Sequence, residues 1–446
     1  MYFAALWLIF SAACSVLAFR RHPLYGLLFY LATLYMHPPS RWWGAMLPDP
    51  GWAAVAAGVT ALAIILHRGR LNPKPLWCAN APAVLLILYT VWMFIQTPWA
   101  LDLESHMLGS VRYAKYLVAF WFVYRIADTK QNLLAVLYAH GAGCGLLGIY
   151  ARYTPREQGR LDGVGGPGID DANTLAMYFA TGAIVCMGLI LTQKGWRRWI
   201  AFVLLALIGN GFVLANSRGA FMGLVAGVLV MLLCKSREHR RMFWALSLVG
   251  LVGFAIIVDK LFIERMFTIG DVVEASEDAD MSARSRMVIY EAQLKMFAEY
   301  PFGSGYRGTV ELSPRFIDRQ WLTVGKDGDE SSAARASHNT FMTTLVEQGV
   351  PGAVLFLWLF GWVCLSVPRI RRNAANRVDP DLATLAGAAC GALMVVFVAG
   401  MATDYLMAEV QFWLYALLVS ALQLSQADLL ARRPVAVPVA GALKLA

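Results

Sequence analysis

Long apolar runs recur along this chain, and they restrict it to folds that cross a membrane. A helix needs roughly 20 residues to cross the core of a bilayer. Seven runs approach or reach that length: 81–96, 133–150, 175–192, 200–215, 242–258, 351–367 and 382–401. Only 15% of the residues are charged, against about 25% in soluble domains. The sequence therefore predicts an all-α polytopic membrane protein.

Shorter apolar runs raise the expected number to about 12 transmembrane helices, or to about 13. The uncertain runs are 24–36, 113–123 and 221–234, which are short for a full crossing. Tilted, extended or partly re-entrant helices would accommodate them.

Basic residues cluster in alternate loops, and this pattern predicts how the chain is oriented. The clusters are Arg20-Arg21, Arg68 to Lys74, Lys194 to Arg198, Lys235 to Arg241, Arg369 to Arg377 and Arg432-Arg433. Cytoplasmic loops are rich in Lys and Arg, so these loops are expected on the cytoplasmic side. The loops 36–51, 97–111, 152–171, 216–219, 259–337 and 402–411 are then expected to face the periplasm. The net charge of +9 reports this topology, and no nucleic acid is expected as a partner.

The same pattern divides one integral membrane domain into four segments. We expect N-terminal transmembrane helices in 1–258, a long periplasmic loop in 259–337, C-terminal transmembrane helices in 338–431 and a cytoplasmic tail in 432–446. The first apolar run lacks the basic start and cleavage site of a signal peptide, so it is expected to be a retained span. The seven cysteines lie mostly in apolar runs at spacings unlike those of metal sites, and they predict no disulfide and no metal.

The loop 259–337 is the only long polar interval in the sequence, and function is expected there. Its acidic run 274–280 is typical of a solvated turn. Ser282 can cap an amphipathic helix with apolar residues at Met287, Tyr290, Leu294, Phe297 and Tyr300. The helix should end at Pro301. The turn 301–306 is rich in glycine, and its backbone N–H groups would be able to approach a ligand.

Five ionisable side chains occupy awkward places near the outer ends of the apolar runs. Arg218 lies in a short turn, where it either binds a partner or snorkels to the membrane surface. Arg265 follows Glu264, which would be able to pair with it. Arg284 and Arg286 begin the amphipathic helix, where the helix dipole disfavours a cation unless an anion is near. His338 starts the next apolar run, and a lone histidine is more often structural than catalytic.

The order of several short motifs resembles the O-antigen ligase and polymerase superfamily. The motifs are Asn216-Ser217-Arg218-Gly219, Glu264-Arg265, Ser282-Ala283-Arg284-Ser285-Arg286, Pro301-Phe302-Gly303-Ser304-Gly305, Ser337-His338-Asn339 and Glu347-Gln348-Gly349. The segments 34–38 and 170–176 also resemble the branch of exosortase-associated O-glycosylation ligases. Two positions depart from the family pattern: Met222 stands where a Leu is frequent, and Tyr290 where many relatives have Trp.

The resemblance implies a GT-C-like, metal-independent glycosyltransferase without a cofactor. Its donor would be a glycan linked to undecaprenyl diphosphate. Arginine binds phosphate oxygens through charge-assisted hydrogen bonds, so Arg218, Arg265, Arg286 and Arg284 are the candidates for binding the diphosphate. His338 is the candidate general base for the acceptor hydroxyl. Direct displacement would invert the anomeric configuration.

We therefore predict an O-antigen ligase of the bacterial inner membrane, with its active site facing the periplasm and membrane lipids around it. Its acceptor would be lipid A-core, and lipopolysaccharide biosynthesis would be its role. A protein O-glycosylation ligase and an O-antigen or exopolysaccharide polymerase remain alternatives with the same chemistry. A polytopic transporter and a passive scaffold are alternatives of other classes. A transporter would be expected to carry ionisable residues near the middle of the membrane and two related halves.

Overall fold

A computed structural model of the chain describes residues 2–156, 161–258, 263, 281–323, 333–375 and 379–431. The α-helices are α1 Tyr2–Arg20, α2 Leu24–Met36, α3 Trp52–Leu66, α4 Ala81–Ile95, α5 Leu103–Ile126, α6 Lys130–Tyr153, α7 Ala172–Thr192, α8 Gly195–Ala215, α9 Arg218–Cys234, α10 Arg240–Ile257, α12 Met281–Glu299, α13 Gly308–Phe316, α14 Thr340–Ala375, α15 Pro380–Ala399 and α16 Glu409–Ala431. Short 3-10 turns occupy Pro38–Ser40, Gly44–Met46, Trp77–Ala79, Thr97–Trp99 and Arg319–Trp321. Arg265, the acidic run 274–280, the tail 432–446 and the side chains of Arg284 and Arg286 lie outside what is described.

Seven of the described helices are long and apolar enough to cross a membrane. They are α1, α6, α7, α8, α10, α14 and α15, and the shorter helices α3, α4 and α9 are also apolar. Within the described residues, the only β-structure is an isolated bridge between Thr323 and Ala334. The prediction of an all-helical, polytopic membrane protein is therefore confirmed, while the number of about 12 spans stays a prediction.

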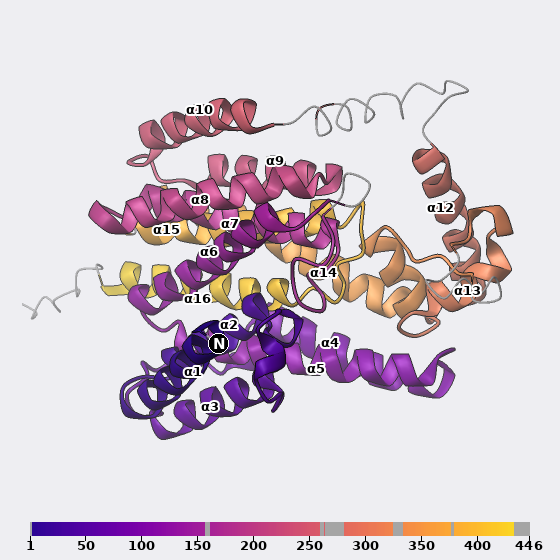
Figure 1. Cartoon of the computed structure of the whole chain (residues 1–446), viewed down its shortest axis with the longest axis horizontal. Coiled ribbons are helices and arrows are strands. Elements are labelled where there is room, and N and C mark those ends of the chain that lie inside the picture. Colours follow the sequence, from indigo (N-terminus) through magenta and orange to yellow (C-terminus); the bar gives the residue numbers. More distant parts are fainter. Residues whose placement is uncertain are drawn as a thin grey trace, which may run out of the picture.

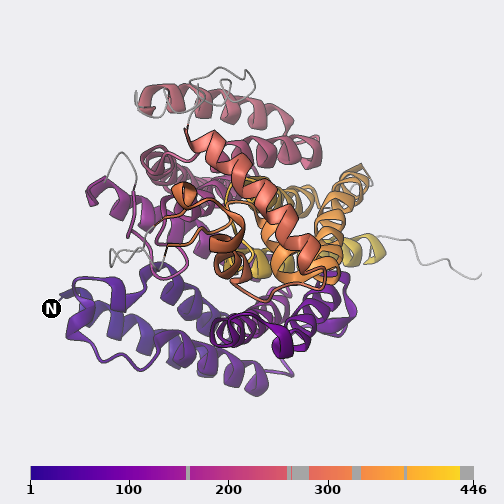
Figure 2. The same cartoon turned by 90° about the vertical axis from the view of Figure 1, so that its right-hand side faces the viewer.

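The helices run mostly along the long axis of the molecule, and α7 and α15 lie inside the bundle (Figures 1 and 2). Helix α15 packs against α7, α9, α14 and α16, and α7 also packs against α6 and α8. Both views show α1 to α5 on one side and α8 to α10 on the opposite side. Helices α12 and α13 extend from one end of the bundle, and the site described below lies at that end.

Loops that were predicted to share the external side meet at the end near α12 and α13. The Arg41 guanidinium donates to the Val164 carbonyl at 2.7 Å, and the Leu101 amide donates to the Ser304 carbonyl at 3.0 Å. The Tyr405 hydroxyl, in the loop 402–411, donates at 2.9 Å to the carbonyl of Asn173, in the first turn of α7 directly after the loop 152–171. The grouping of these loops agrees with the alternating charge pattern, and the compartment that this end faces stays a prediction.

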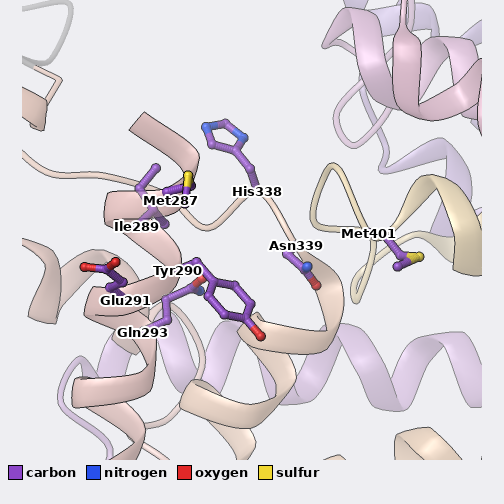
Figure 3. Close-up of a pocket in the computed structure, with 8 residues that line it drawn as sticks. All are labelled: Met287, Ile289, Tyr290, Glu291, Gln293, His338, Asn339 and Met401. Atoms are coloured by element: carbon purple, nitrogen blue, oxygen red, sulfur yellow. The ribbon is translucent and has the colours of Figure 1, made fainter. Parts of the chain in front are cut away.

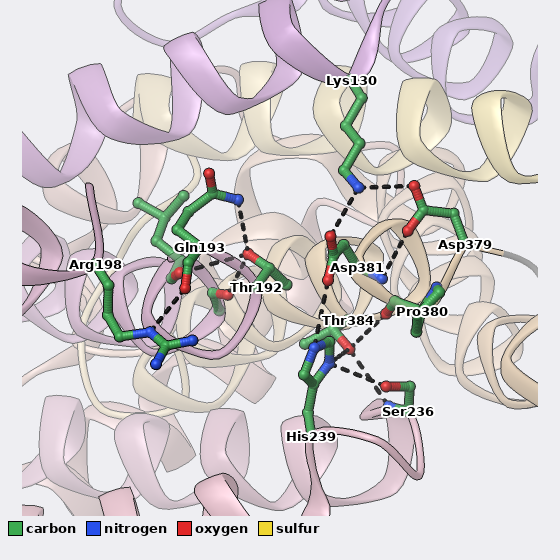
Figure 4. Close-up of polar contacts among 12 residues, drawn as sticks. Lys130, Thr192, Gln193, Arg198, Ser236, His239, Asp379, Pro380, Asp381 and Thr384 are labelled. Carbon is green, nitrogen blue, oxygen red and sulfur yellow. Dashed lines mark hydrogen bonds and ion pairs between the residues drawn. The ribbon is translucent and has the colours of Figure 1, made fainter. Parts of the chain in front are cut away.

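Loops from the opposite set form a charged network at the other end (Figure 4). Lys130 at the start of α6 binds Asp379 at 2.7 Å and Asp381 at 2.8 Å. His239, before α10, lies 3.3 Å from Asp381 and 2.9 Å from the Thr384 hydroxyl. These contacts connect α6, α10 and α15, which are far apart in the sequence.

The glycine-rich turn 301–306 packs against a break in α14. This packing corrects the expectation that the backbone N–H groups of the turn approach a ligand. Gly349 has φ +63° and ψ −166°, so the helix breaks there. The amides of Ser304 and Gly305 donate to the carbonyls of Val346 and Glu347, each at 3.0 Å, and the Gly303 amide donates to Tyr300 at 2.9 Å. Because all three N–H groups are used within the fold, this turn positions α14 and does not present those groups to a ligand.

We expect Gly349→Ala to destabilise the protein. An added Cβ would lie 2.3 Å from the backbone carbon of Phe302, and a positive φ alone costs an L-residue about 1–2 kcal/mol. A thermal unfolding scan of the purified variant should show a lower Tm than wild type. Gly361→Ala is the matched control, because a Cβ at this other α14 glycine meets nothing within 4 Å. Equal Tm values for the two variants would contradict the account of the turn.

The amphipathic helix predicted in the long loop is present as α12, and Met287 and Tyr290 of its predicted apolar face line a cavity. Ile289, Ala292 and Met296 are buried against a small cluster that includes residues of α13 and α14. Met287 and Tyr290, from the predicted apolar face, are 66% and 49% exposed. The spacing of apolar residues identified the helix, whereas the packing of α13 decided which face is covered.

The uncertain run 113–123 is part of α5, which has 24 residues. Asp102 caps this helix by accepting the Ser105 amide at 2.9 Å. Its outer turns carry Glu104, His106 and Arg112, which interrupt the apolar pattern without interrupting the helix. Hydropathy alone therefore underestimates its length.

Candidate functional site

His338 lines an open cavity of about 310 Å³ at the end of the bundle that carries α12. Met287 and Tyr290 of α12 line one side, Met401 lies opposite, and Asn339 follows His338 (Figure 3). The His338 side chain is half-buried. A histidine in such a position is accessible to a ligand in the cavity while its backbone is held by the fold.

Helix α14 begins directly after His338, and the sequence explains why it begins there. The Asn339 side-chain oxygen accepts the amides of Phe341 at 2.9 Å and Met342 at 3.2 Å, as an N-cap residue does. The hydroxyl of Ser337 donates to the Asn339 carbonyl at 3.1 Å. These contacts fix the short turn that presents His338.

A buried side-chain contact attaches helix α12 to this turn. The Gln293 amide group donates to the Ser337 hydroxyl at 2.8 Å, and both side chains are buried. Arg284 and Arg286 lie on the first turns of α12, before Met287 and Tyr290 of the cavity wall. The backbone thus brings the two arginine positions to the same helix end as the cavity.

Arg218 is the first residue of α9, and its turn is shaped by its two neighbours. Asn216 adopts the left-handed conformation with φ +50°, which asparagine tolerates better than most residues. Ser217 caps α9 by accepting the Ala220 amide at 3.4 Å and donates to the Asn173 side chain at 2.9 Å. The turn therefore begins a helix at Arg218, where the sequence alone predicted a loop through residue 219.

A chain of hydrogen bonds connects the turn of Arg218 to the turn of His338. Asn173, which binds Ser217, accepts the Tyr405 hydroxyl at 2.9 Å, and the Tyr405 amide donates to the Thr340 hydroxyl at 2.8 Å. The Thr340 amide donates to the carbonyl of Gly400 at 2.7 Å. Two of the predicted residues, Arg218 and His338, which are 120 positions apart, thus lie on turns that one polar framework connects. Arg265 lies outside the described residues, so the structure does not relate it to this site.

Close packing brings α9 to the same loop. A Cβ added at Gly219 would lie 2.8 Å from the Cβ of Ala402, and the adjacent Met401 lines the cavity with His338. Only glycine allows this approach, which explains why a glycine follows Arg218. Gln293, Met401 and Tyr405 were not predicted for the site, because no local pattern in the sequence marks them.

The loop between α15 and α16 also carries an acidic side chain with an altered pKa. Burial raises the pKa of the Asp404 carboxyl to about 6, although its bond from the Leu406 amide favours the ionised form. The charge of Asp404 acts on Tyr306, whose pKa is raised mainly by burial. Asp404 therefore ionises at a higher pH than an ordinary aspartate, in the loop that follows Met401 of the cavity wall.

We expect Asp404→Asn to be more thermostable than wild type at pH 7.5. When the pKa of a carboxyl is higher in the folded than in the unfolded protein, its contribution to stability is fully present below the pKa of the unfolded state, about 3.9. This contribution is lost as the pH rises through about 6. Differential scanning fluorimetry should show similar Tm values near pH 4 and a difference of roughly 2–4 °C at pH 7.5. A Tm difference that does not change with pH would contradict this assignment.

Residues 203–357 match a family model described as O-antigen ligase. This segment extends from α8 into α14 and contains Arg218, Arg265, Arg284, Arg286 and His338. No curated protein matches the chain.

Proposed function

Because the chain belongs to the O-antigen ligase superfamily, we propose that it transfers a glycan from undecaprenyl diphosphate to lipid A-core. The observation that carries this proposal is His338 in an open cavity, on a turn connected by hydrogen bonds to that of Arg218. The reaction is a step of lipopolysaccharide biosynthesis.

In this proposal, arginines bind the diphosphate of the donor. Arg218, Arg286 and Arg265 are the main candidates, and Arg284 lies two residues before Arg286. Planar guanidinium groups donate charge-assisted hydrogen bonds to phosphate oxygens. The same groups stabilise the charge that develops on the leaving diphosphate, which is a preorganised electrostatic contribution. The position of Arg218 at the start of α9 and the backbone of α12 beside the cavity support the assignment of the diphosphate to these arginines.

His338 acts as the general base. A hydroxyl of the acceptor sugar attacks the anomeric carbon and gives its proton to the imidazole. The bond between that carbon and the diphosphate oxygen breaks, and undecaprenyl diphosphate leaves with the bonding electrons. A single displacement from the opposite face inverts the anomeric configuration, and no metal takes part in a step. NMR of the product linkage tests the inversion, since retained configuration would exclude a single displacement.

We further propose that the protein resides in the inner membrane, with a GT-C-like arrangement of about 12 spans. The end with the cavity faces the periplasm, and the segments are those predicted from the charge pattern: 1–258, 259–337, 338–431 and 432–446. The grouping of the loops into two sets at opposite ends supports this orientation, because the basic clusters belong to one set.

Two functions with the same chemistry compete with the lipid A-core acceptor. A protein acceptor would make the chain an O-glycosylation ligase, and a growing glycan as acceptor would make it a polymerase. A transporter would need broken helices in two related halves. Instead, Arg218 and the backbone positions of Arg284 and Arg286 lie at the starts of helices, and His338 lies directly before one.

The acceptor is tested with purified protein in detergent without divalent metal. Undecaprenyl diphosphate glycan is offered with lipid A-core in one reaction and with a candidate acceptor protein in another. Product on lipid A-core supports the proposed ligase, whereas product on protein alone assigns O-glycosylation. Elongated glycan that remains on undecaprenyl diphosphate assigns polymerisation.

A further inference from the structure

Two cations on α5 have no role in the site described above. Arg112 and Lys115 lie in the interior of this 24-residue helix, and both side chains are exposed. Residues three apart lie on one face of a helix. Over the described ranges, Lys115 has no hydrogen bond or ion pair. A charge in the interior of a membrane helix normally faces a cavity or a partner, because exposure to lipid tails is costly.

Lys115 lines a second cavity, of about 560 Å³, which α2, α3 and α5 form with the loop before α3. One part of the lining is polar and includes Tyr30, Thr33 and Lys115. The remainder is mainly apolar, with Ala53, Ala54, Ala57, Val118, Ala119 and Phe122. Such a lining suits an amphiphile with an anionic head and a hydrocarbon tail.

Of the described residues that line this cavity, Lys115 supplies the positive charge. His37 also lines it, but burial and the nearby Arg41 lower the pKa of His37, and its Nδ1 lies 2.6 Å from the Ser40 hydroxyl. Asp49 is the acidic residue of the lining; its carboxylate accepts the Gly51 amide at 3.0 Å and forms no ion pair with Lys115 in the described part of the chain. The Lys115 ammonium is therefore the group in the lining suited to a phosphate.

This cavity lies at the same end of the bundle as His338. The Tyr30 hydroxyl donates to Glu409 at 2.8 Å, and Glu409 begins α16 directly after the loop that binds Thr340. Arg112 lies one turn closer to the outer end of α5. Its positive charge acts on Tyr306 and opposes the rise in the Tyr306 pKa that burial causes. Polar groups thus extend from the second cavity toward the first.

We propose that the second cavity binds the phosphorylated lipid anchor of the acceptor. The anchor phosphate binds Lys115, the acyl chain lies along Ala57 and Phe122, and the sugars extend toward His338. This inference rests on the proposed function, since it assigns the lipid acceptor its own site apart from the donor arginines.

Lys115→Met tests this site through the kinetics of the acceptor. The variant should raise the KM for phosphorylated lipid A-core about tenfold or more and leave the KM for the donor unchanged. Lys115→Arg should recover most of the loss. Lys194→Met, at the opposite end of the bundle, is the control. An acceptor whose lipid phosphates have been removed should show equal KM values with wild type and Lys115→Met. An unchanged acceptor KM in Lys115→Met would overturn the proposal.

Binding without turnover separates this proposal from the function on which it rests. Fluorescent phosphorylated lipid A and its dephosphorylated form are titrated against protein in detergent without donor. Tighter binding of the phosphorylated form by wild type, lost in Lys115→Met, supports the site. Equal affinities of wild type and Lys115→Met for the phosphorylated form would overturn it. A wild type that transfers no glycan would refute the proposed function, while this titration would still decide the site.

Discussion

His338→Ala is expected to reduce the rate of glycan transfer by about 10²–10⁴-fold, the usual contribution of a positioned general base. The variant keeps the cavity walls but lacks the group that receives the acceptor proton. Donor binding should change little, because the diphosphate is assigned to arginines. The measurement is kcat with purified protein, together with a direct titration of the donor.

His22→Ala is a matched control for this variant. His22 is also half-buried but lies in the turn before α2, where its Nδ1 accepts the Leu24 amide at 3.1 Å. The His22→Ala variant should transfer glycan at close to the wild-type rate. Transfer by His338→Ala within about threefold of wild type would remove His338 from the role of base.

Arg218→Ala is expected to lower kcat by about 10²–10³-fold, as the loss of one preorganised electrostatic group does elsewhere. Arg218→Lys should recover only part of this loss, because an ammonium group cannot form the two parallel hydrogen bonds of a guanidinium. The capping contacts of Ser217 do not involve the Arg218 side chain, so α9 should still form. Kinetics of transfer and circular dichroism of both variants test this expectation.

Arg315→Ala provides the corresponding arginine control at the same end of the molecule. Arg315 is exposed and pairs with Glu299 at 2.6 Å, and exposed pairs of this kind contribute little to stability. Its variant should retain wild-type kinetics. A loss of activity as large as that of Arg218→Ala would indicate a general dependence on positive charge at this end, without a specific diphosphate contact.

The sequence predicted those parts of the fold that depend on local patterns. Apolar runs indicated the membrane class, and the spacing of Met287, Tyr290 and Leu294 indicated α12. The buried face of α12 was not predictable in this way, because it depends on Leu312 and Ile317 of the distant α13 region. The role of the turn at Gly303 was also missed, because its partners Val346 and Glu347 lie more than 40 residues away.

The candidate site shows the same division between local and long-range information. Arg218 is a candidate because a charged group in a short turn between apolar runs is unusual, whereas His338 is a candidate base mainly through the family resemblance. The connection between their turns through Asn173, Tyr405 and Thr340 could not be predicted from the sequence, because it joins four separate segments of the chain. Lys115 was passed over because α5 has too many charged residues to stand out as a span.

The most direct test of the central claim is the stoichiometry between undecaprenyl diphosphate released and glycan transferred. Purified wild-type protein is incubated with labelled donor and lipid A-core, and both products are quantified by mass spectrometry. Our account predicts one undecaprenyl diphosphate for each glycan joined to the acceptor, with the formation of both products slowed about 10²–10⁴-fold in His338→Ala. Donor that is bound or moved across vesicles but stays intact would contradict a transferase and favour a transporter.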